Sequence, residues 1–184
     1  MFKLSVDTHI ICRKGEKMEP DEVVEKVKSQ FGDKILDVEV LSETRVHVEV
    51  PKEEIVNLAS YLKHELGFNY PDTNFGTDRK DDGVIELIWY VGRMDSPLLV
   101  GMKTKIDREN PIVPSMTKIW QGFNWGEREA YDMLGVLFEG HPDLRRIYLP
   151  EDWDGFPLRE DYVYKRPRYT KPEDNDPDYY VKKF

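Results

Sequence analysis

Two segments carry apolar residues at the spacing of an amphipathic helix. In residues 19–32 the apolar stripe follows two acids and ends at a glycine, and in residues 51–67 it recurs every three or four positions up to a closing glycine. The stripes consist of Val23, Val24, Val27 and Phe31 in the first segment, and of Ile55, Leu58, Ala59, Leu62 and Leu66 in the second. Both segments are therefore expected to be helices with one buried face, which leaves His64 on the outer side.

Three other segments show the patterns of β-strands. Residues 36–50 alternate between apolar and polar positions on both sides of a short polar stretch, which predicts a β-hairpin with one buried face. Residues 84–91 are nearly all apolar, as in a central strand, and residues 97–106 alternate again. The hairpin's predicted buried positions are Leu36, Val38, Val40, Val46, Val48 and Val50, with His47 on the solvent side. Residues 68–83 have the composition of a polar loop.

This order of elements predicts an α+β fold. We expect a two-layer α/β sandwich in the order α-β-β-α-β-β, with room for one further strand and with the helices on one face of the sheet. Residues 1–106 would form the α+β core domain, and residues 107–161 a region packed on the core and on a partner. Residues 162–184 would form an extended C-terminal arm, because this segment has three prolines, five tyrosines and only two aliphatic residues.

Composition and charge exclude several classes of protein. The formal charge of −9 and the pI of about 5.0 argue against a nucleic-acid partner and against docking on an anionic membrane. A single cysteine, Cys12, cannot provide an internal disulfide, a cysteine-rich zinc site or an iron–sulfur ligand set. No apolar run approaches the roughly 20 residues of a membrane span, and the N-terminus lacks a signal peptide, so we expect a cytoplasmic chain without direct membrane insertion.

The densest cluster of charged residues lies between Trp125 and Leu149. Asn124 is a candidate cap for a helix whose third position is Glu127, and Gly135 would end that helix. A short strand and a turn would follow and lead to Arg145 and Arg146. Just upstream, Ser115 is a plausible cap for another short helix.

Catalysis by this cluster finds little support in the spacing of its residues. Glu127 and Glu129 are two positions apart, so on a helix they point roughly 200° apart and cannot share a substrate. One histidine and one carboxylate, His141 and Asp143, fall short of the three or four ligands that a metal site usually needs. The interpretation that fits better is architectural: the acids would pair with arginines and tie the helix to the following turn or to another subunit. The expected pairs join Glu127, Glu129 and Asp132 to Arg128, Arg145 and Arg146.

Several of these residues fall at the spacing of a known signature. They are Glu127-Arg128-Glu129, Asp132-Met133-Leu134, His141 and Arg145-x-Ile147, with "VPSMTKIW" upstream and "GFPLREDY" downstream. In this respect the chain resembles the family of the respiratory complex I 30 kDa subunit, which is a component of NADH-quinone oxidoreductase. The resemblance is strong from about Pro111 to Tyr162, and the preceding elements are similar to the family's N-terminal fold, in which two helices pack on a mixed sheet.

The resemblance implies a non-catalytic structural subunit. Such subunits hold no cofactor and lie in the hydrophilic arm, on the cytoplasmic side, as a peripheral part of a membrane-bound oxidoreductase. The implied partners are a large subunit related to the nickel–iron hydrogenase catalytic subunit and a small iron–sulfur subunit. These partners would hold the iron–sulfur clusters, with nickel–iron as a further candidate cofactor. The interface residues implied by the match are Glu127, Arg128, Glu129, Asp132, His141, Arg145 and Arg146, with Pro157, Leu158 and Arg159 as a second patch.

Three functions stay open at this point. The first is a subunit of a quinone-reducing complex linked to NADH, ferredoxin or F420. The second is the equivalent subunit of a ferredoxin-linked membrane-bound nickel–iron hydrogenase or formate hydrogenlyase, which the thermophile-like composition, with only two glutamines, slightly favours. The third is a free-standing acid/base or metal enzyme.

Overall fold

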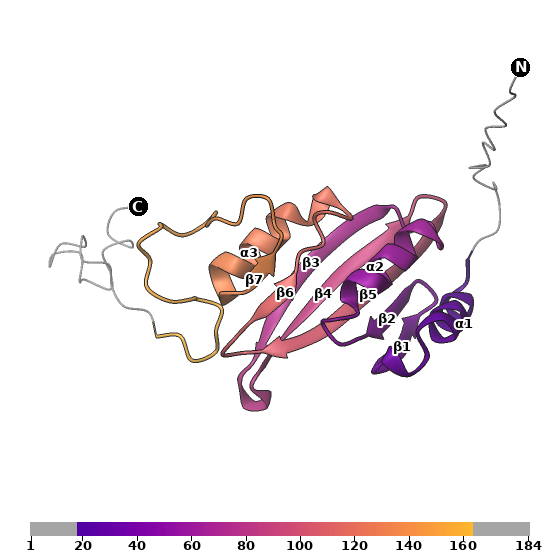
Figure 1. The fold of residues 1–184 in the computed structure, drawn as a ribbon, viewed down its shortest axis with the longest axis horizontal. Coiled ribbons are helices and arrows are strands. Elements are labelled where there is room, and N and C mark those ends of the chain that lie inside the picture. Colours follow the sequence, from indigo (N-terminus) through magenta and orange to yellow (C-terminus); the bar gives the residue numbers. More distant parts are fainter. Residues whose placement is uncertain (1–17, 164–184) are drawn as a thin grey trace, which may run out of the picture.

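The computed structural model describes residues 18–163 of the chain (Figure 1). The helices are α1 (Pro20–Phe31), α2 (Ile55–His64) and α3 (Asn124–Leu134). The strands are β1 (Asp37–Ser42), β2 (Arg45–Glu49), β3 (Tyr70–Arg79), β4 (Val84–Arg93), β5 (Ser96–Asp107), β6 (Ile112–Pro114) and β7 (Leu137–Glu139). The predicted α+β class is confirmed, and the order of elements agrees roughly with the expected one, except that the further strand after α2 is β3, in a segment predicted as a loop.

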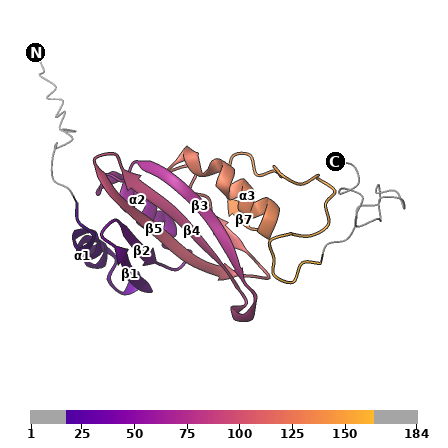
Figure 2. The ribbon, with the colours of Figure 1, turned by 180° about the vertical axis from the view of Figure 1, so that it is seen from behind.

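One mixed five-stranded sheet forms the centre of the molecule, in the order β1-β2-β5-β4-β3. β2 and β5 run parallel, and the other neighbours are antiparallel. α2 covers one face of this sheet, while α3 and the segment after it lie at the β3 edge (Figures 1 and 2). A small parallel pair, β6 and β7, lies beside α3.

A single hydrophobic core joins the sheet to the helices. The inward side chains of the three central strands alternate with outward ones, as the period of a strand requires. The helices contribute the stripes predicted from the sequence, including Val23, Val27, Leu58 and Leu62, all fully buried. The same core continues past residue 106 to Met116, Phe123 and Leu134, so α3 packs on the sheet through apolar contacts.

The prediction for the first strand of the hairpin is wrong in part. Val46, Val48 and Val50 are buried as expected, but Leu36 is 62% exposed and Val40 is 46% exposed. Only Val38 of the first strand packs against the core. The reason is the position of β1 at the outer edge of the sheet, where it has one neighbouring strand and little cover from the helices.

The prediction of a polar loop over residues 68–83 is also wrong, because most of this segment is the edge strand β3. Its sequence lacks apolar alternation because α3 lies very close to it. A Cβ on Gly76 would be 2.7 Å from the Leu134 side chain, and one on Gly126 of α3 would be 2.2 Å from the Asn74 side chain. Small and polar residues on this strand therefore allow the helix to approach.

No helix within residues 18–163 is long and apolar enough to cross a membrane. The predicted C-terminal arm lies outside the described residues except for Tyr162 and Val163, and the division into three parts stays a prediction.

Candidate functional site

The candidate site consists of α3 and the chain from His141 to Tyr162, which we call the return segment. Both predicted caps in this region are wrong. Asn124 is the first residue of α3 and no side chain caps the helix, while the chain after Ser115 forms a turn and not an α-helix. Both predictions fail for the same reason. The Glu127 side chain points into the core and does not take part in a capping pattern with Asn124, and the Ser115 hydroxyl donates to Glu127 and does not cap a helix.

Glu127 is fully buried and joins three parts of the fold. Its carboxylate accepts hydrogen bonds from the Ser115 hydroxyl at 2.6 Å, the Met116 backbone N–H at 2.7 Å and the Trp89 indole N–H at 3.3 Å. Burial raises the pKa of Glu127 to about 7, although the three donors act in the opposite direction. The residue thus links α3 to β4 and to the chain after β6, out of reach of solvent.

Asp132 binds the return segment at residues 146–149. Its Oδ2 accepts three backbone N–H groups, from Ile147 at 3.0 Å, Tyr148 at 2.7 Å and Leu149 at 3.1 Å. Its Oδ1 forms an ion pair with Arg146 at 2.9 Å. Burial alone would raise the pKa of Asp132, but the backbone donors and Arg146 outweigh burial and hold the pKa below its ordinary value.

Two arginines hold the same segment through its carbonyl groups. Arg128 donates to the backbone oxygens of Arg145 at 3.1 Å and Arg146 at 3.4 Å, and its guanidinium stacks over the Trp125 ring at 4.8 Å. Arg146 also donates to the Trp153 carbonyl at 3.3 Å. Planar guanidinium groups suit such multiple contacts, so both arginines fix the course of the backbone.

The second predicted patch closes the C-terminal end of α3. The Leu158 N–H donates to the Met133 carbonyl at 3.0 Å, and Arg159 donates to the Leu134 carbonyl at 2.9 Å. These bonds satisfy carbonyl groups that the end of a helix leaves without partners. The guanidinium groups of Arg146 and Arg159 both lie over the Phe156 ring, 5.7 and 5.2 Å from its centre, and the adjoining Pro157 is half-buried.

A buried ion pair that the sequence did not reveal fastens the far end of the return segment. Arg108, after β5, binds both oxygens of Asp78 in β3, at 2.7 and 3.0 Å, and also contacts Asp161. The Glu160 N–H donates to Asp78 at 2.9 Å. The Arg108 hydrogen bonds lower the pKa of Asp78 more than burial raises it. Sequence reasoning missed Asp78 because it lies in the strand predicted as a loop.

The predicted acid–arginine pairs form only in part. Asp132 pairs with Arg146, whereas Arg145 is exposed and pairs with Asp143 at 3.0 Å. Glu129 is exposed, and Glu127 is bound by neutral donors instead of an arginine. His141 accepts the Asp143 N–H on Nδ1 at 3.0 Å and directs Nε2 toward the Asn124 carbonyl at 3.3 Å. It therefore joins the start of the return segment to the start of α3.

The geometry favours a structural role for these residues. Within residues 18–163, no group of three or more histidine, cysteine, aspartate or glutamate side chains is placed to hold a metal ion. Glu127 and Asp132 are fully buried and bound by donors of the chain itself. A substrate would have no access to either carboxylate without displacing α3 or the return segment.

Comparisons with known proteins agree on one family. Residues 48–168 match the family described as respiratory-chain NADH dehydrogenase, 30 Kd subunit. A NADH-quinone oxidoreductase subunit of Roseiflexus sp. (strain RS-1) is 37% identical over 143 residues, which cover 76% of this chain and 81% of the relative. The corresponding NADH-quinone oxidoreductase subunit of Moorella thermoacetica is 39% identical over 113 residues, covering 61% and 76% respectively.

Two solved structures share the fold. The trypsin-resistant fragment of Nqo5 superimposes with a TM-score of 0.56 at 25% identity, covering 67% of this chain and 98% of the fragment. A chain of the membrane-bound sulfane sulfur reductase, an archaeal respiratory membrane complex, gives a TM-score of 0.69 at 22% identity, covering 84% of this chain and 96% of that one.

Proposed function

Because the chain belongs to the family of the respiratory-chain NADH dehydrogenase 30 kDa subunit, we propose that it is a non-catalytic structural subunit of a complex-I-type membrane-bound oxidoreductase. It would lie in the hydrophilic arm on the cytoplasmic side and clamp the hydrogenase-like large subunit, next to the small iron–sulfur subunit. Redox cofactors would be held by those partners.

One observation carries the proposal: several of the signature residues fix the course of a surface segment. Arg128 and Asp132 of α3 bind residues 145–149 of the return segment, and Leu158 and Arg159 bind its later part to the end of α3. A loop held at so many points loses little conformational entropy when a partner binds it. That property suits a subunit whose task is to present a rigid contact surface.

The proposal is tested by purifying the full-length chain, tagged at its N-terminus, from its native host in mild detergent. Quantitative mass spectrometry is expected to recover a hydrogenase-like large subunit and a small iron–sulfur subunit in equal amounts with the tagged chain. The remaining subunits would distinguish a quinone-reducing complex from a hydrogenase or formate hydrogenlyase. Recovery of the chain without either partner would contradict the proposal.

We also expect the purified chain alone to contain iron, nickel and zinc far below one atom per molecule. The sequence has a single cysteine, and the described residues offer no cluster of metal ligands. Metal analysis by mass spectrometry before and after treatment with a chelator checks this, with the thermal midpoint as a second readout. A stoichiometric metal, or a midpoint that falls on chelation, would reopen the possibility of a metal enzyme.

A further inference from the structure

The exposed side of the site carries two large aromatic side chains. Trp125 is 66% exposed and Tyr148 is 63% exposed. Both are tied to one face of α3. Trp125 and Asp132 belong to this helix and are seven residues apart, which is about two helical turns, so they share a face. Asp132 in turn accepts a hydrogen bond from the Tyr148 backbone N–H. The two backbone positions are therefore fixed within roughly 10 Å along the helix.

The backbone beneath both residues is held in place by the buried contacts of the site. Arg128 stacks on Trp125 with one face of its guanidinium and donates to the carbonyl groups before Tyr148. Asp132 binds the N–H groups of Tyr148 and of both its neighbours. Exposed aromatic residues on such a rigid base resemble the residues that contribute most to binding at protein interfaces.

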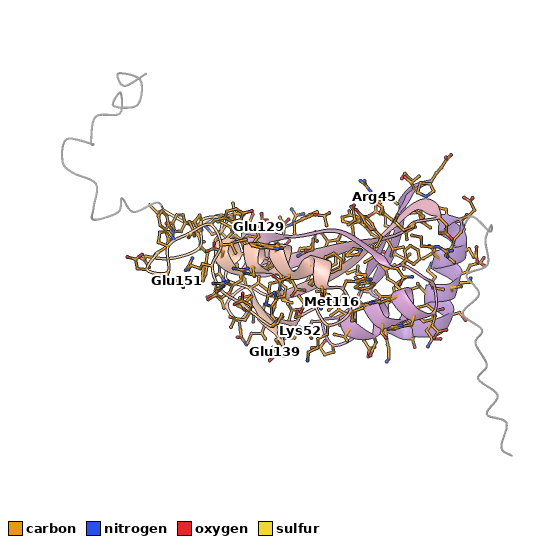
Figure 3. All side chains as sticks on the ribbon, turned by 90° about the horizontal axis from the view of Figure 1, so that it is seen from above. Arg45, Lys52, Met116, Glu129, Glu139 and Glu151 are labelled. Carbon is orange, nitrogen blue, oxygen red and sulfur yellow. The ribbon has the colours of Figure 1, made fainter. Side chains whose placement is uncertain are left out.

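The surroundings of these aromatics are acidic. Glu129, Glu151 and Asp152 are exposed, and Figure 3 places Glu129 and Glu151 at the α3 end of the molecule. Among residues 141–163, Arg146 binds Asp132, Arg159 binds the Leu134 carbonyl and Arg145 pairs with Asp143, so these arginines are engaged within the chain. A partner surface that complements this one must therefore bring its own positive charge.

We propose that Trp125, Tyr148, Glu129 and Glu151 form a docking surface for a protein subunit that presents arginine and lysine side chains. Guanidinium groups from the partner would stack on the two aromatic rings and pair with the flanking carboxylates. A second copy of this chain fits poorly, because it would bring the same acidic surface and a formal charge of −9. The inference rests on the proposed function, since it assigns the contact surface of an assembled subunit.

The test measures binding of the full-length chain to an immobilised pair of subunits. The pair consists of the hydrogenase-like large subunit and the small iron–sulfur subunit, which are expressed together. Trp125→Ala and Tyr148→Ala are each expected to weaken binding by at least about 10-fold, as for central aromatic residues of interfaces. Met94→Ala, at a residue that is 87% exposed and lies at the β4–β5 turn, is the matched control and should bind like wild type. The thermal midpoints of the isolated variants should stay close to that of wild type, because both side chains are largely exposed.

Charge reversal provides an independent test of the docking surface. Glu129→Lys combined with Glu151→Lys should weaken binding and reduce its dependence on salt, whereas Glu43→Lys in the exposed β1–β2 turn should change neither. If wild type binds and the aromatic and charge variants bind equally well, the docking surface is overturned while the proposed function stands. If wild type itself does not bind the pair, the proposed function and this inference both fail.

Discussion

Replacing Asp132 by alanine is expected to lower the free energy of unfolding by roughly 3–5 kcal/mol, the loss typical of removing one partner of a buried ion pair. The variant would leave the largely buried Arg146 guanidinium without its carboxylate and three backbone N–H groups without an acceptor. Each unsatisfied buried donor adds a penalty of about 1–3 kcal/mol unless water reaches it. We therefore expect residues 146–149 to detach from α3.

Urea unfolding of the full-length chain followed by circular dichroism measures this loss, and hydrogen exchange at residues 147–149 locates it. Glu129→Ala is the matched control, since it removes an exposed carboxylate from the same helix and should change stability by less than about 0.5 kcal/mol. Asp132→Asn keeps the volume but must turn its amide N–H₂ toward either Arg146 or the backbone donors, so it should fall close to alanine. Equal stability of wild type and Asp132→Ala would show that the return segment does not depend on this carboxylate.

The sequence predicted most of the fold because helices and central strands bury one regular face. The stripes of α1 and α2 and the apolar run of β4 follow directly from that requirement. β3 escaped prediction because its neighbour α3 selects small and polar residues such as Gly76 and Asn74, which do not alternate. Local patterns cannot reveal a strand whose composition is determined by a helix some fifty residues later in the chain.

The contacts of the candidate site differ from those that the sequence predicted. Charge matching suggested acid–arginine pairs throughout, yet the structure uses backbone groups for most of the binding: Arg128 binds carbonyls and Asp132 binds amides. Spacing on a helix shows which residues share a face, but it does not show whether that face meets solvent or another segment. The Asp78–Arg108–Asp161 cluster needs residues far apart in sequence, so only the three-dimensional fold brings them together.

Glu127 is expected to make the stability of the chain fall as pH rises from about 5 to 8. Burial raises the pKa of Glu127 in the folded chain to about 7, above the ordinary value of 4.5 that applies after unfolding. Between these values the folded chain binds one proton more than the unfolded chain, so the contribution to stability is complete below pH 4.5 and is lost as pH rises through 7. At 1.36 kcal/mol per pKa unit, the loss reaches at most roughly 3 kcal/mol.

Glu127→Gln should abolish this pH dependence and be more stable than wild type at pH 8. A glutamine at this position can accept the Met116 and Trp89 N–H groups with its oxygen and donate to the Ser115 hydroxyl, which can then donate to Thr117. The variant therefore keeps the hydrogen bonds of the neutral acid without the penalty of a buried charge, and at pH 5 it should equal wild type.

Glu127→Ala is the contrasting variant: it leaves Ser115, Met116 and Trp89 without their acceptor and should be less stable than Glu127→Gln at both pH values. Unfolding free energies measured between pH 5 and 8 for the three proteins decide the matter. If the difference between wild type and Glu127→Gln does not change with pH, the carboxyl does not titrate in this range, and its burial is offset by the three donors alone.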